Sequence, residues 1–427
     1  MENLKNKTYG LLRWSEQYTK TDMVYLAKGG FWLTFGQISS SISVFILAVV
    51  FANLLTKDTY GTYKYVISIS GMITVLTLKG MEPAVLHAIS RGFEGVLLPA
   101  LRTKIRWGIL ATLISLILSF YYYLNGNNTL AVSFVIISGF LPIIDSFGIY
   151  NIFLQGKKLF RLSAIYTSLS QIISTAILIT GVLLTQNLFI ILTLYFASWT
   201  ILRFVFLLVT IKKSPPNNRY DQKTIPYGKY SSLINILDSI VSSVDGLLIF
   251  HYLGAVNLAI YSFAIAPISQ IKSVTGHIST LAIPKLSNRP SQEIENSLIK
   301  RILLLFAIGI SITILYIFAA PYIYQIFFPK YTDAVPFSQL FAVTMALSLP
   351  QTIFGAATSS KLTMIPPKML YLWNLPGIIF IVFALLFVIK LGIIGVIIGR
   401  LISLISGFII QIIIWEKIKK IEKENFI

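Results

Sequence analysis

The sequence is divided into long, continuously apolar blocks that short polar segments separate. Each block has about 18–25 residues, and an α-helix needs about 20 apolar residues to cross roughly 30 Å of hydrocarbon. The blocks are apolar throughout and do not alternate with a period of two, which excludes a membrane β-barrel. The sequence therefore predicts an all-α integral membrane protein.

Hydropathy predicts twelve membrane spans in the 427 residues. They lie near 29–54, 60–80, 107–124, 130–154, 162–184, 188–211, 231–252, 259–283, 302–320, 334–357, 370–389 and 392–415. Only 12% of the residues are charged, whereas a soluble domain has about a quarter, so an ordinary globular enzyme is excluded. The chain has no cysteine, which excludes disulfides, thiolate metal sites and cysteine nucleophiles.

The net charge of +19 is explained by membrane topology. With a cytoplasmic N-terminus, 28 of the 35 basic residues fall in inside segments. Four fall in outside segments: Lys57, Lys64, Lys330 and Lys390. Three fall within spans: Arg203, Lys272 and Arg400. The positive-inside rule then predicts that both termini are cytoplasmic. The inside loops are expected to contact anionic membrane lipids, and no nucleic-acid partner is expected.

An internal repeat divides the chain. Segments 55–63 and 253–261 share a leucine, a small residue and a tyrosine at one offset of 198 residues. A basic linker lies between them, so we predict an N-terminal six-helix half at 1–211, a cytoplasmic linker at 212–229 and a C-terminal six-helix half at 230–427. Two such bundles in one orientation would enclose a central cavity as a substrate path. The alternative is a helical bundle without a path.

Several short motifs, in this order and spacing, resemble a known family. They are YGTY at 60–63, SVDGLLIFHYLG at 243–254, YSFA at 261–264, FFPKYTDAVP at 327–336 and LGIIG at 391–395. With them the chain resembles the polysaccharide-type, Wzx-like flippases of the multidrug/oligosaccharidyl-lipid/polysaccharide exporter superfamily. One departure is Gly246, because the family often has a basic residue directly after the aspartate in span seven.

The resemblance implies a fold and a function. It implies two six-helix bundles in a V around a central cavity. It also implies a flippase that moves an undecaprenyl-diphosphate-linked oligosaccharide, such as an O-antigen, capsule or exopolysaccharide repeat unit, from the inner to the outer leaflet. The expected location is the cytoplasmic membrane of a bacterium or archaeon, and we expect a monomer.

Five ionisable residues lie deep within predicted spans, where an uncompensated charge costs several kcal/mol. They are Asp145, Arg203, Asp245, Lys272 and Arg400. Such residues usually face a cavity or a partner. Lysine and arginine suit phosphate oxygens, whereas hydroxyls and amides suit sugars. Lys272 is the leading candidate for a phosphate contact, ahead of Arg400 and Arg203.

Span seven carries a polar stripe. At 100° per residue, Asn235, Asp238, Ser242 and Asp245 share one face of a continuous helix. Gln37 belongs to a milder stripe in span one, and Lys28 at its inner mouth could receive the headgroup as it enters. The alternative is that polar side chains join helices and that acid–base pairs neutralise each other structurally.

No feature predicts an enzyme, a catalytic residue or a resident cofactor. The three histidines lack metal-ligand spacing, there is no nucleotide-binding loop, and no outer loop is long enough for a catalytic site. Movement could follow the membrane potential; coupling to Na⁺ or H⁺ through Asp245 or Asp238 is the alternative. The competing functions are a multidrug/cation antiporter of the same superfamily and a lipid II flippase.

Overall fold

The computed structural model describes residues 23–234, 236–287, 291–361 and 371–425. Its first half contains α2 (Met23–Leu54), α3 (Lys57–Ile73), η1 (Thr74–Thr77), α4 (Met81–Ser90), η2 (Glu94–Val96), α5 (Leu97–Leu124), α6 (Asn128–Ser138), α7 (Leu141–Phe147), α8 (Ile149–Gly156), α9 (Phe160–Leu184) and α10 (Leu188–Lys213). Its second half contains α11 (Thr224–Ile234), α12 (Ile236–Val241), α13 (Val244–Leu253), α14 (Ala255–Ser287), α15 (Ser291–Phe327), η3 (Pro329–Ala334), α16 (Val335–Ser360), η5 (Tyr371–Asn374), α18 (Leu375–Leu391) and α19 (Ile393–Asn425). No strand occurs among these residues, which confirms the predicted fold class.

The number of membrane spans is smaller by length and composition than the sequence predicts. Among the described residues, eight helices are long and apolar enough to cross a membrane, and ten if each of two bent helix pairs is one span. The fold is that of a multi-pass membrane protein, whereas the count of twelve and the orientation of the termini stay predictions. So does the division at 212–229.

Three predicted spans are not continuous helices. The span at 60–80 continues into α4 with a bend of 51° at 78–80, where Leu78 is left-handed with φ 59°. The span at 130–154 bends by 45° between α6 and α7, and Pro142 lies in the first turn of α7. Proline fits a helix start because its N–H would be unpaired there. The span at 231–252 consists of the three short helices α11, α12 and α13.

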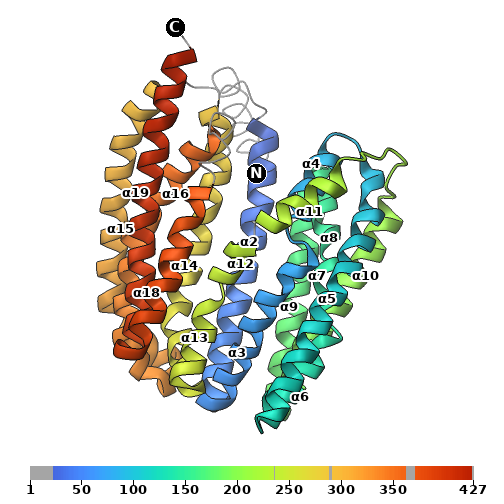
Figure 1. Cartoon of the computed structure of the whole chain (residues 1–427), viewed down its shortest axis with the longest axis vertical. Helices are drawn as coiled ribbons and strands as arrows, with labels where there is room; N and C mark the ends of the chain where they lie inside the picture. The colour runs from blue at the N-terminus through green and yellow to red at the C-terminus, as the bar shows by residue number, and fades with distance from the viewer. Residues whose placement is uncertain (1–22, 235, 288–290, 362–370, 426–427) are drawn as a thin grey trace, which may run out of the picture.

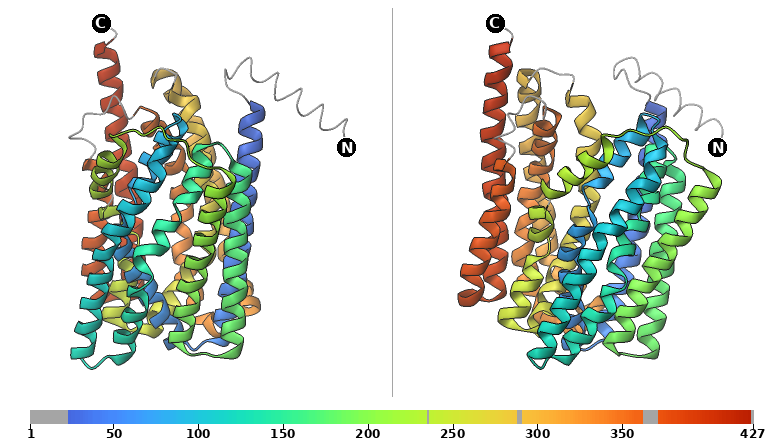
Figure 2. Two further views of the ribbon diagram at one scale, coloured as in Figure 1. Left: turned by 90° about the vertical axis from the view of Figure 1, so that its right-hand side faces the viewer. Right: turned by 45° about the vertical axis from the view of Figure 1, so that its right-hand side comes forward.

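The helices form two groups that diverge toward one end of the molecule (Figures 1 and 2). One group holds α4 to α10, the other holds α14 to α19, and α2, α3, α12 and α13 lie between them (Figure 1). We name the diverging end, at which α4, α8 and α10 end, the basic end, because these helices end at or next to Arg91, Lys157 and Lys213 (Figure 1). The opposite end, with the turns at 125–127, 185–187 and 254, is the turn end.

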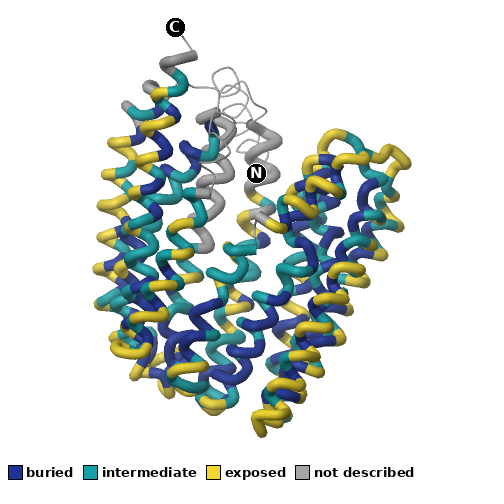
Figure 3. Tube along the Cα trace, viewed as in Figure 1, coloured by how far each residue is buried: buried dark blue, intermediate teal, exposed yellow. Residues whose placement is uncertain are grey.

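The buried core shows where the two halves are joined. The largest cluster of buried apolar side chains combines both halves, from Phe51 and Phe134 to Phe263 and Val388, and lies toward the turn end (Figure 3). The buried members of two smaller clusters each come from one half, and Ile225 of α11 packs against the cluster of the first half. The halves therefore share a core at the turn end, whereas at the basic end α11 packs on the first half and the cluster of the second half is separate.

The joint at the turn end rests on a close approach of α3 to the start of α14. A side chain on Gly61 would lie 1.8 Å from the carbonyl oxygen of Ala255, so only glycine fits there. One residue away, the rings of Tyr60 and Phe263 stack with 4.5 Å between their centroids. Helices α3 and α14 begin 198 residues apart, the offset of the sequence repeat.

The linker after α10 is fixed to the N-terminal half. The backbone N–H of Asn217 and the ammonium of Lys157 both donate to Glu94, and the Asn217 amide donates to the carbonyl of Gly92. Nearer α11, the backbone N–H of Lys223 donates to Asp221, which lowers the pKa of that carboxyl because the bond favours its charged form. The linker thus lies across the basic end of the first half, where these hydrogen bonds hold it.

Candidate functional site

The polar stripe predicted for span seven does not form, because that segment is broken. Asp238 is exposed on α12, whereas Asp245 is buried in the first turn of α13, and the turn at 242–243 separates the two helices. These residues share one face only if the helix is continuous at 100° per residue, and the turn at 242–243 interrupts it. Asn235 lies outside the described residues.

Asp245 forms a buried ion pair with Arg400 of α19. Arg400 Nη2 lies 2.8 Å from Asp245 Oδ2, and the hydroxyl of Tyr261 donates to the same oxygen at 2.6 Å. Arg400 also donates to the carbonyl of Val241, and its guanidinium carbon lies 3.8 Å from the ring centroid of Phe380. The carboxylate is therefore held by a cation and a hydroxyl from two other helices.

The partner of Asp245 comes from 155 residues away, where the resemblance suggested a basic residue next in sequence. Gly246 occupies that next position, and a side chain there would meet the hydroxyl of Ser68 at 2.2 Å. Helix α13 thus packs directly on α3, and the positive charge is supplied from α19 instead.

Lys272 joins α14 to α16. Its ammonium donates to the hydroxyl of Thr344 at 2.7 Å and lies 5.1 Å from the ring centroid of Phe341. It also interacts electrostatically with Arg400. Asp245, Tyr261, Lys272 and Arg400 thus form one group, which we name the C-half cluster. It contains two cations and one carboxylate.

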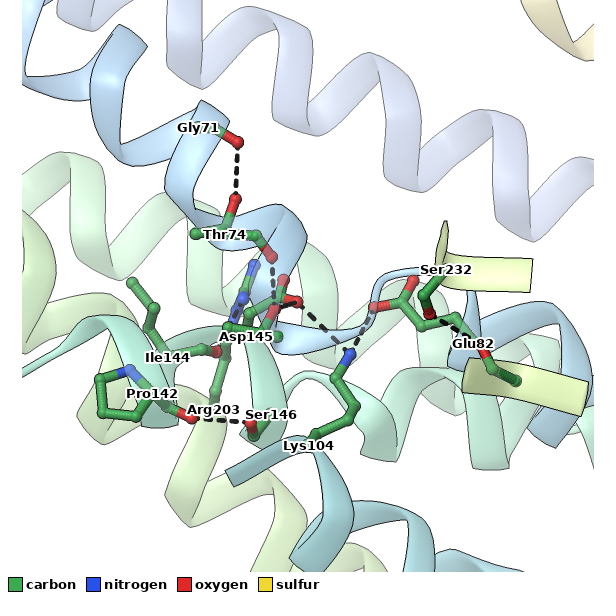
Figure 4. Close-up of polar contacts among 12 residues, drawn as sticks. Gly71, Thr74, Glu82, Lys104, Pro142, Ile144, Asp145, Ser146, Arg203 and Ser232 are labelled. Carbon is green, nitrogen blue, oxygen red and sulfur yellow. Dashed lines mark hydrogen bonds and ion pairs between the residues drawn. The ribbon is translucent and has the colours of Figure 1, made fainter. Parts of the chain in front are cut away.

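Asp145 and Arg203 lie in a separate group within the first half (Figure 4). Asp145 Oδ2 accepts from the hydroxyl of Thr77 at 2.7 Å and lies 3.4 Å from Lys104 Nζ. Lys104 is fully buried and also lies 3.0 Å from Glu82 Oε1, between the two carboxylates (Figure 4).

Arg203 completes this N-half cluster, which consists of Glu82, Lys104, Asp145 and Arg203. Its Nη1 donates to the carbonyl of Ile144, and its guanidinium carbon lies 5.0 Å from the Trp199 ring centroid. A cavity of about 200 Å³ is lined by Glu82, Asp145 and Arg203 among others. The cluster holds two cations and two carboxylates, so its formal charge is zero.

Five of the predicted residues thus lie in two clusters, Asp145 and Arg203 in the first half and Asp245, Lys272 and Arg400 in the second. Asp238 is exposed and belongs to neither cluster, Gln37 is partly buried on α2, and the side chain of Lys28 lies outside the described residues. Among the described residues, no group of three or more histidine, aspartate or glutamate residues could hold a metal ion. Each cluster therefore places paired charges of opposite sign within the membrane-spanning helices.

Two cations inside helices were not predicted, the fully buried Lys104 and the partly buried Lys64. Lys64 lies seven residues inside α3, not in an outside loop, and Lys104 lies seven residues inside α5, not in an inside loop. A rise of 1.5 Å per residue places each about 10 Å from its helix start. The aromatic and apolar neighbours of Lys64 were the available signal, whereas Lys104 stands between Arg102 and Arg106 and its neighbours gave none.

Comparison with known proteins identifies the fold and the family. The profile described as "Polysaccharide biosynthesis protein" matches residues 26–290. No curated protein matches the sequence. Among solved structures, the lipid II flippase MurJ in an inward closed conformation is 16% identical, with a TM-score of 0.64 over 92% of this chain and 90% of that one.

Two further structures share the fold. A multidrug resistance MATE family transporter in an inward-facing conformation is 15% identical, with a TM-score of 0.60 over 91% of this chain and 99% of that one. A MOP superfamily transporter from Pyrococcus furiosus, described by the reverse polarity of its binding pocket, is 14% identical, with a TM-score of 0.58 over 92% and 96%. Since the matched profile covers more than half of the residues, this chain belongs to the polysaccharide biosynthesis protein family, and its fold is that of the flippase and transporter structures named above.

Proposed function

We propose that the protein is a flippase for an undecaprenyl-diphosphate-linked oligosaccharide, moving it from the inner to the outer leaflet of a bacterial or archaeal cytoplasmic membrane. The observation that carries this proposal is the sign of the charge in the two clusters. The C-half cluster has two cations, Lys272 and Arg400, and one carboxylate, Asp245, which pairs with Arg400, whereas the N-half cluster is neutral. A net positive site inside the membrane suits a diphosphate.

The divergence of the halves supports a path for the headgroup. Because the largest shared core lies toward the turn end, the polar headgroup would approach from the basic end, which the positive-inside rule assigns to the cytoplasm. The lipid tail stays in the bilayer. Alternating access would then separate α3 from α14 at the turn end and join the halves at the basic end.

The membrane potential is a sufficient driving force in principle. Each negative charge that leaves an inside-negative cell gains about 2.3 kcal/mol per 100 mV, and a diphosphate carries about two. Coupling to Na⁺ or H⁺ is the alternative. Exposed Asp238 is then a better candidate than Asp245, whose carboxylate Arg400 and Tyr261 already hold.

A multidrug/cation antiporter is the second candidate, because a MATE transporter shares the fold with a TM-score of 0.60. A cationic drug needs a carboxylate that can face it, and the deep carboxylates of both clusters are ion-paired. A lipid II flippase is a third candidate, because MurJ also shares the fold. It differs from the main proposal only in the glycan.

The test uses the purified protein in liposomes with a fluorescent undecaprenyl-diphosphate disaccharide as the probe. We expect wild-type protein to move the probe, Lys272→Met to slow it at least tenfold, and Lys272→Arg to retain most of the rate. Lys330→Met is the matched control, because Lys330 is exposed in η3. Each variant is first checked for its unfolding temperature.

Three results would contradict parts of the proposal. Export of ethidium with no movement of the lipid probe would favour the antiporter. Movement of lipid II but not of the disaccharide lipid would favour the lipid II flippase. An unchanged rate after collapse of the membrane potential would exclude the potential as the driving force, and Asp238→Asn would then test ion coupling.

A further inference from the structure

A second polar cavity lies in the first half and shares Trp199 with the cavity of the N-half cluster. It has a volume of about 220 Å³ and is lined by residues of α2, α3, α9 and α10. The lining side chains that matter here are Lys64, Gln171, Ser174, Thr175, Tyr195 and Trp199. Gln171 and Ser174 belong to a polar stripe that the sequence shows in the span at 162–184, whereas Lys64 was assigned to an outside segment.

Lys64 is the one charged residue in the lining of this cavity. It interacts electrostatically with Asp245, but the described residues provide no ion pair or hydrogen bond to its ammonium. A cation at this depth usually has a partner or faces a polar cavity. A lysine in the wall also disfavours a metal ion or a cationic drug as the occupant, because like charges repel.

The cavity offers hydroxyl and amide groups opposite the lysine. Ser174 is 1% exposed, and its hydroxyl has no hydrogen-bond partner among the described residues. A buried hydroxyl left unpaired is costly, so such a group usually binds water or a ligand. Gln171 Nε2 donates to the Thr175 hydroxyl at 3.2 Å, and the Gln171 carbonyl oxygen completes the polar wall.

Aromatic side chains form the remaining wall. Trp199 and Tyr195 come from α10, and Tyr63 from α3 packs edge-on against Tyr195 with 6.0 Å between the ring centroids. Flat aromatic faces pack well against the C–H face of a sugar ring, whereas a bare inorganic anion gains nothing from them. The combination of cation, hydroxyls and aromatics therefore fits a sugar that carries a negative charge.

We propose that this cavity is a subsite for one anionic sugar unit, such as a hexuronate, of the transported glycan. The proposal rests on the proposed function, because it assigns the sugar and not the diphosphate to this place. The volume agrees with a single unit: 220 Å³ is roughly seven times the share of one liquid water and is below the range of drug-sized pockets. Lys64 would pair with the carboxylate, Ser174 and Gln171 would bind ring hydroxyls, and Trp199 would cover one ring face.

The experiment titrates the purified full-length protein in detergent with D-glucuronate, D-glucose and inorganic phosphate, using calorimetry. We expect D-glucuronate to bind at least tenfold more tightly than either of the others. Lys64→Met should remove that preference, Lys64→Arg should keep it, and Ser174→Ala should weaken both sugars. Lys330→Met, on the exposed surface, should match the wild-type protein.

Equal affinity for D-glucuronate and D-glucose in the wild-type protein would overturn the proposal. So would phosphate binding as tightly as D-glucuronate, because the aromatic wall would then have no role. If Lys64→Met does not fold, the Ser174→Ala titration decides, and unchanged sugar binding there counts against the site. These binding results are independent of the flipping assay, so failure of the proposed function and failure of this subsite are distinguishable.

Discussion

Arg400 and Asp245 form a 2.8 Å ion pair that joins α19 to α13 although the residues are 155 positions apart. Tyr261 adds α14 through a hydrogen bond to the same carboxylate oxygen. The two charged side chains are 23% and 9% exposed, so water compensates them only in part. Each charge therefore depends on the other, and three helices of the second half depend on the pair.

Asp245→Asn should destabilise the protein more than loss of the whole pair. The single change leaves the Arg400 charge buried without a carboxylate, and breaking a buried pair in this way typically lowers the free energy of unfolding by about 3–5 kcal/mol. The double variant Asp245→Asn/Arg400→Gln should recover at least half of that loss. Unfolding temperatures in detergent measure both, with Arg102→Gln, an exposed arginine, as the control. Equal losses in the single and double variants would refute the dependence.

Gly61→Ala should separate the halves at the turn end. Its new methyl group would lie 1.8 Å from the carbonyl oxygen of Ala255, a backbone atom that cannot move without shifting α14. Overpacking in a tight core typically lowers the free energy of unfolding by about 1–3 kcal/mol. Gly139→Ala is the matched control, because the nearest atom to its added methyl is 3.9 Å away. Similar unfolding temperatures for the two variants would show that the turn-end joint tolerates displacement.

The same joint explains what the sequence repeat means. Segments 55–63 and 253–261 were predicted only to mark corresponding places in two halves. In the structure these segments contact each other through Gly61 and Ala255, and Tyr60 stacks on Phe263, two residues beyond the second segment. Gly61, the small residue of the first copy, was the sequence signal of that contact; its counterpart Ala259 is not the residue that it meets.

Hydropathy predicted where helices lie but not where they bend. A continuous apolar block has the same composition whether its helix is straight or broken. Hydropathy therefore could not predict the bend at 78–80 or the division of one span into α11, α12 and α13. Pro142 marked the second bend, but proline is common in straight membrane helices as well. The stripe predicted for span seven was wrong for this reason.

The buried charges were only half predictable. The apolar block was begun at residue 107, so Lys104 was assigned to an inside loop, and Lys64 was counted as outside although it falls within the predicted span at 60–80. In the structure both lysines lie inside helices. Which carboxylate each cation meets depends on contacts between distant helices, and no local spacing encodes the pairing of Asp245 with Arg400.

Charge reversal at the turn end should shift the two halves toward separation. Lys57 of α3 lies 2.5 Å from Asp333 of η3, and both side chains are partly exposed. An exposed pair contributes about 0.2–1 kcal/mol, so Asp333→Lys should raise opening by up to about fivefold. The chain has no cysteine, so Ala259→Cys, fully buried in α14, reports opening through its rate of maleimide labelling.

The double variant Lys57→Asp/Asp333→Lys restores opposite charges and should return labelling to the starting rate. Lys390→Asp, a reversal of an exposed lysine at the end of α18, is the control for net charge. Faster labelling in the double variant than in Asp333→Lys alone would rule out the pair as a contact between the halves.

Lys104→Met should destabilise the first half because one ammonium serves two carboxylates. Lys104 is 0% exposed, and Asp145 is 19% exposed at its side chain, so removal of the cation leaves two facing negative charges, one of them largely buried. We expect a loss of about 3–5 kcal/mol in the free energy of unfolding. Lys104→Met/Asp145→Asn should recover much of it, because Glu82 is 34% exposed and can be hydrated. Exposed Lys212→Met should change nothing. If Lys104→Met unfolds at the wild-type temperature, the network does not stabilise the half.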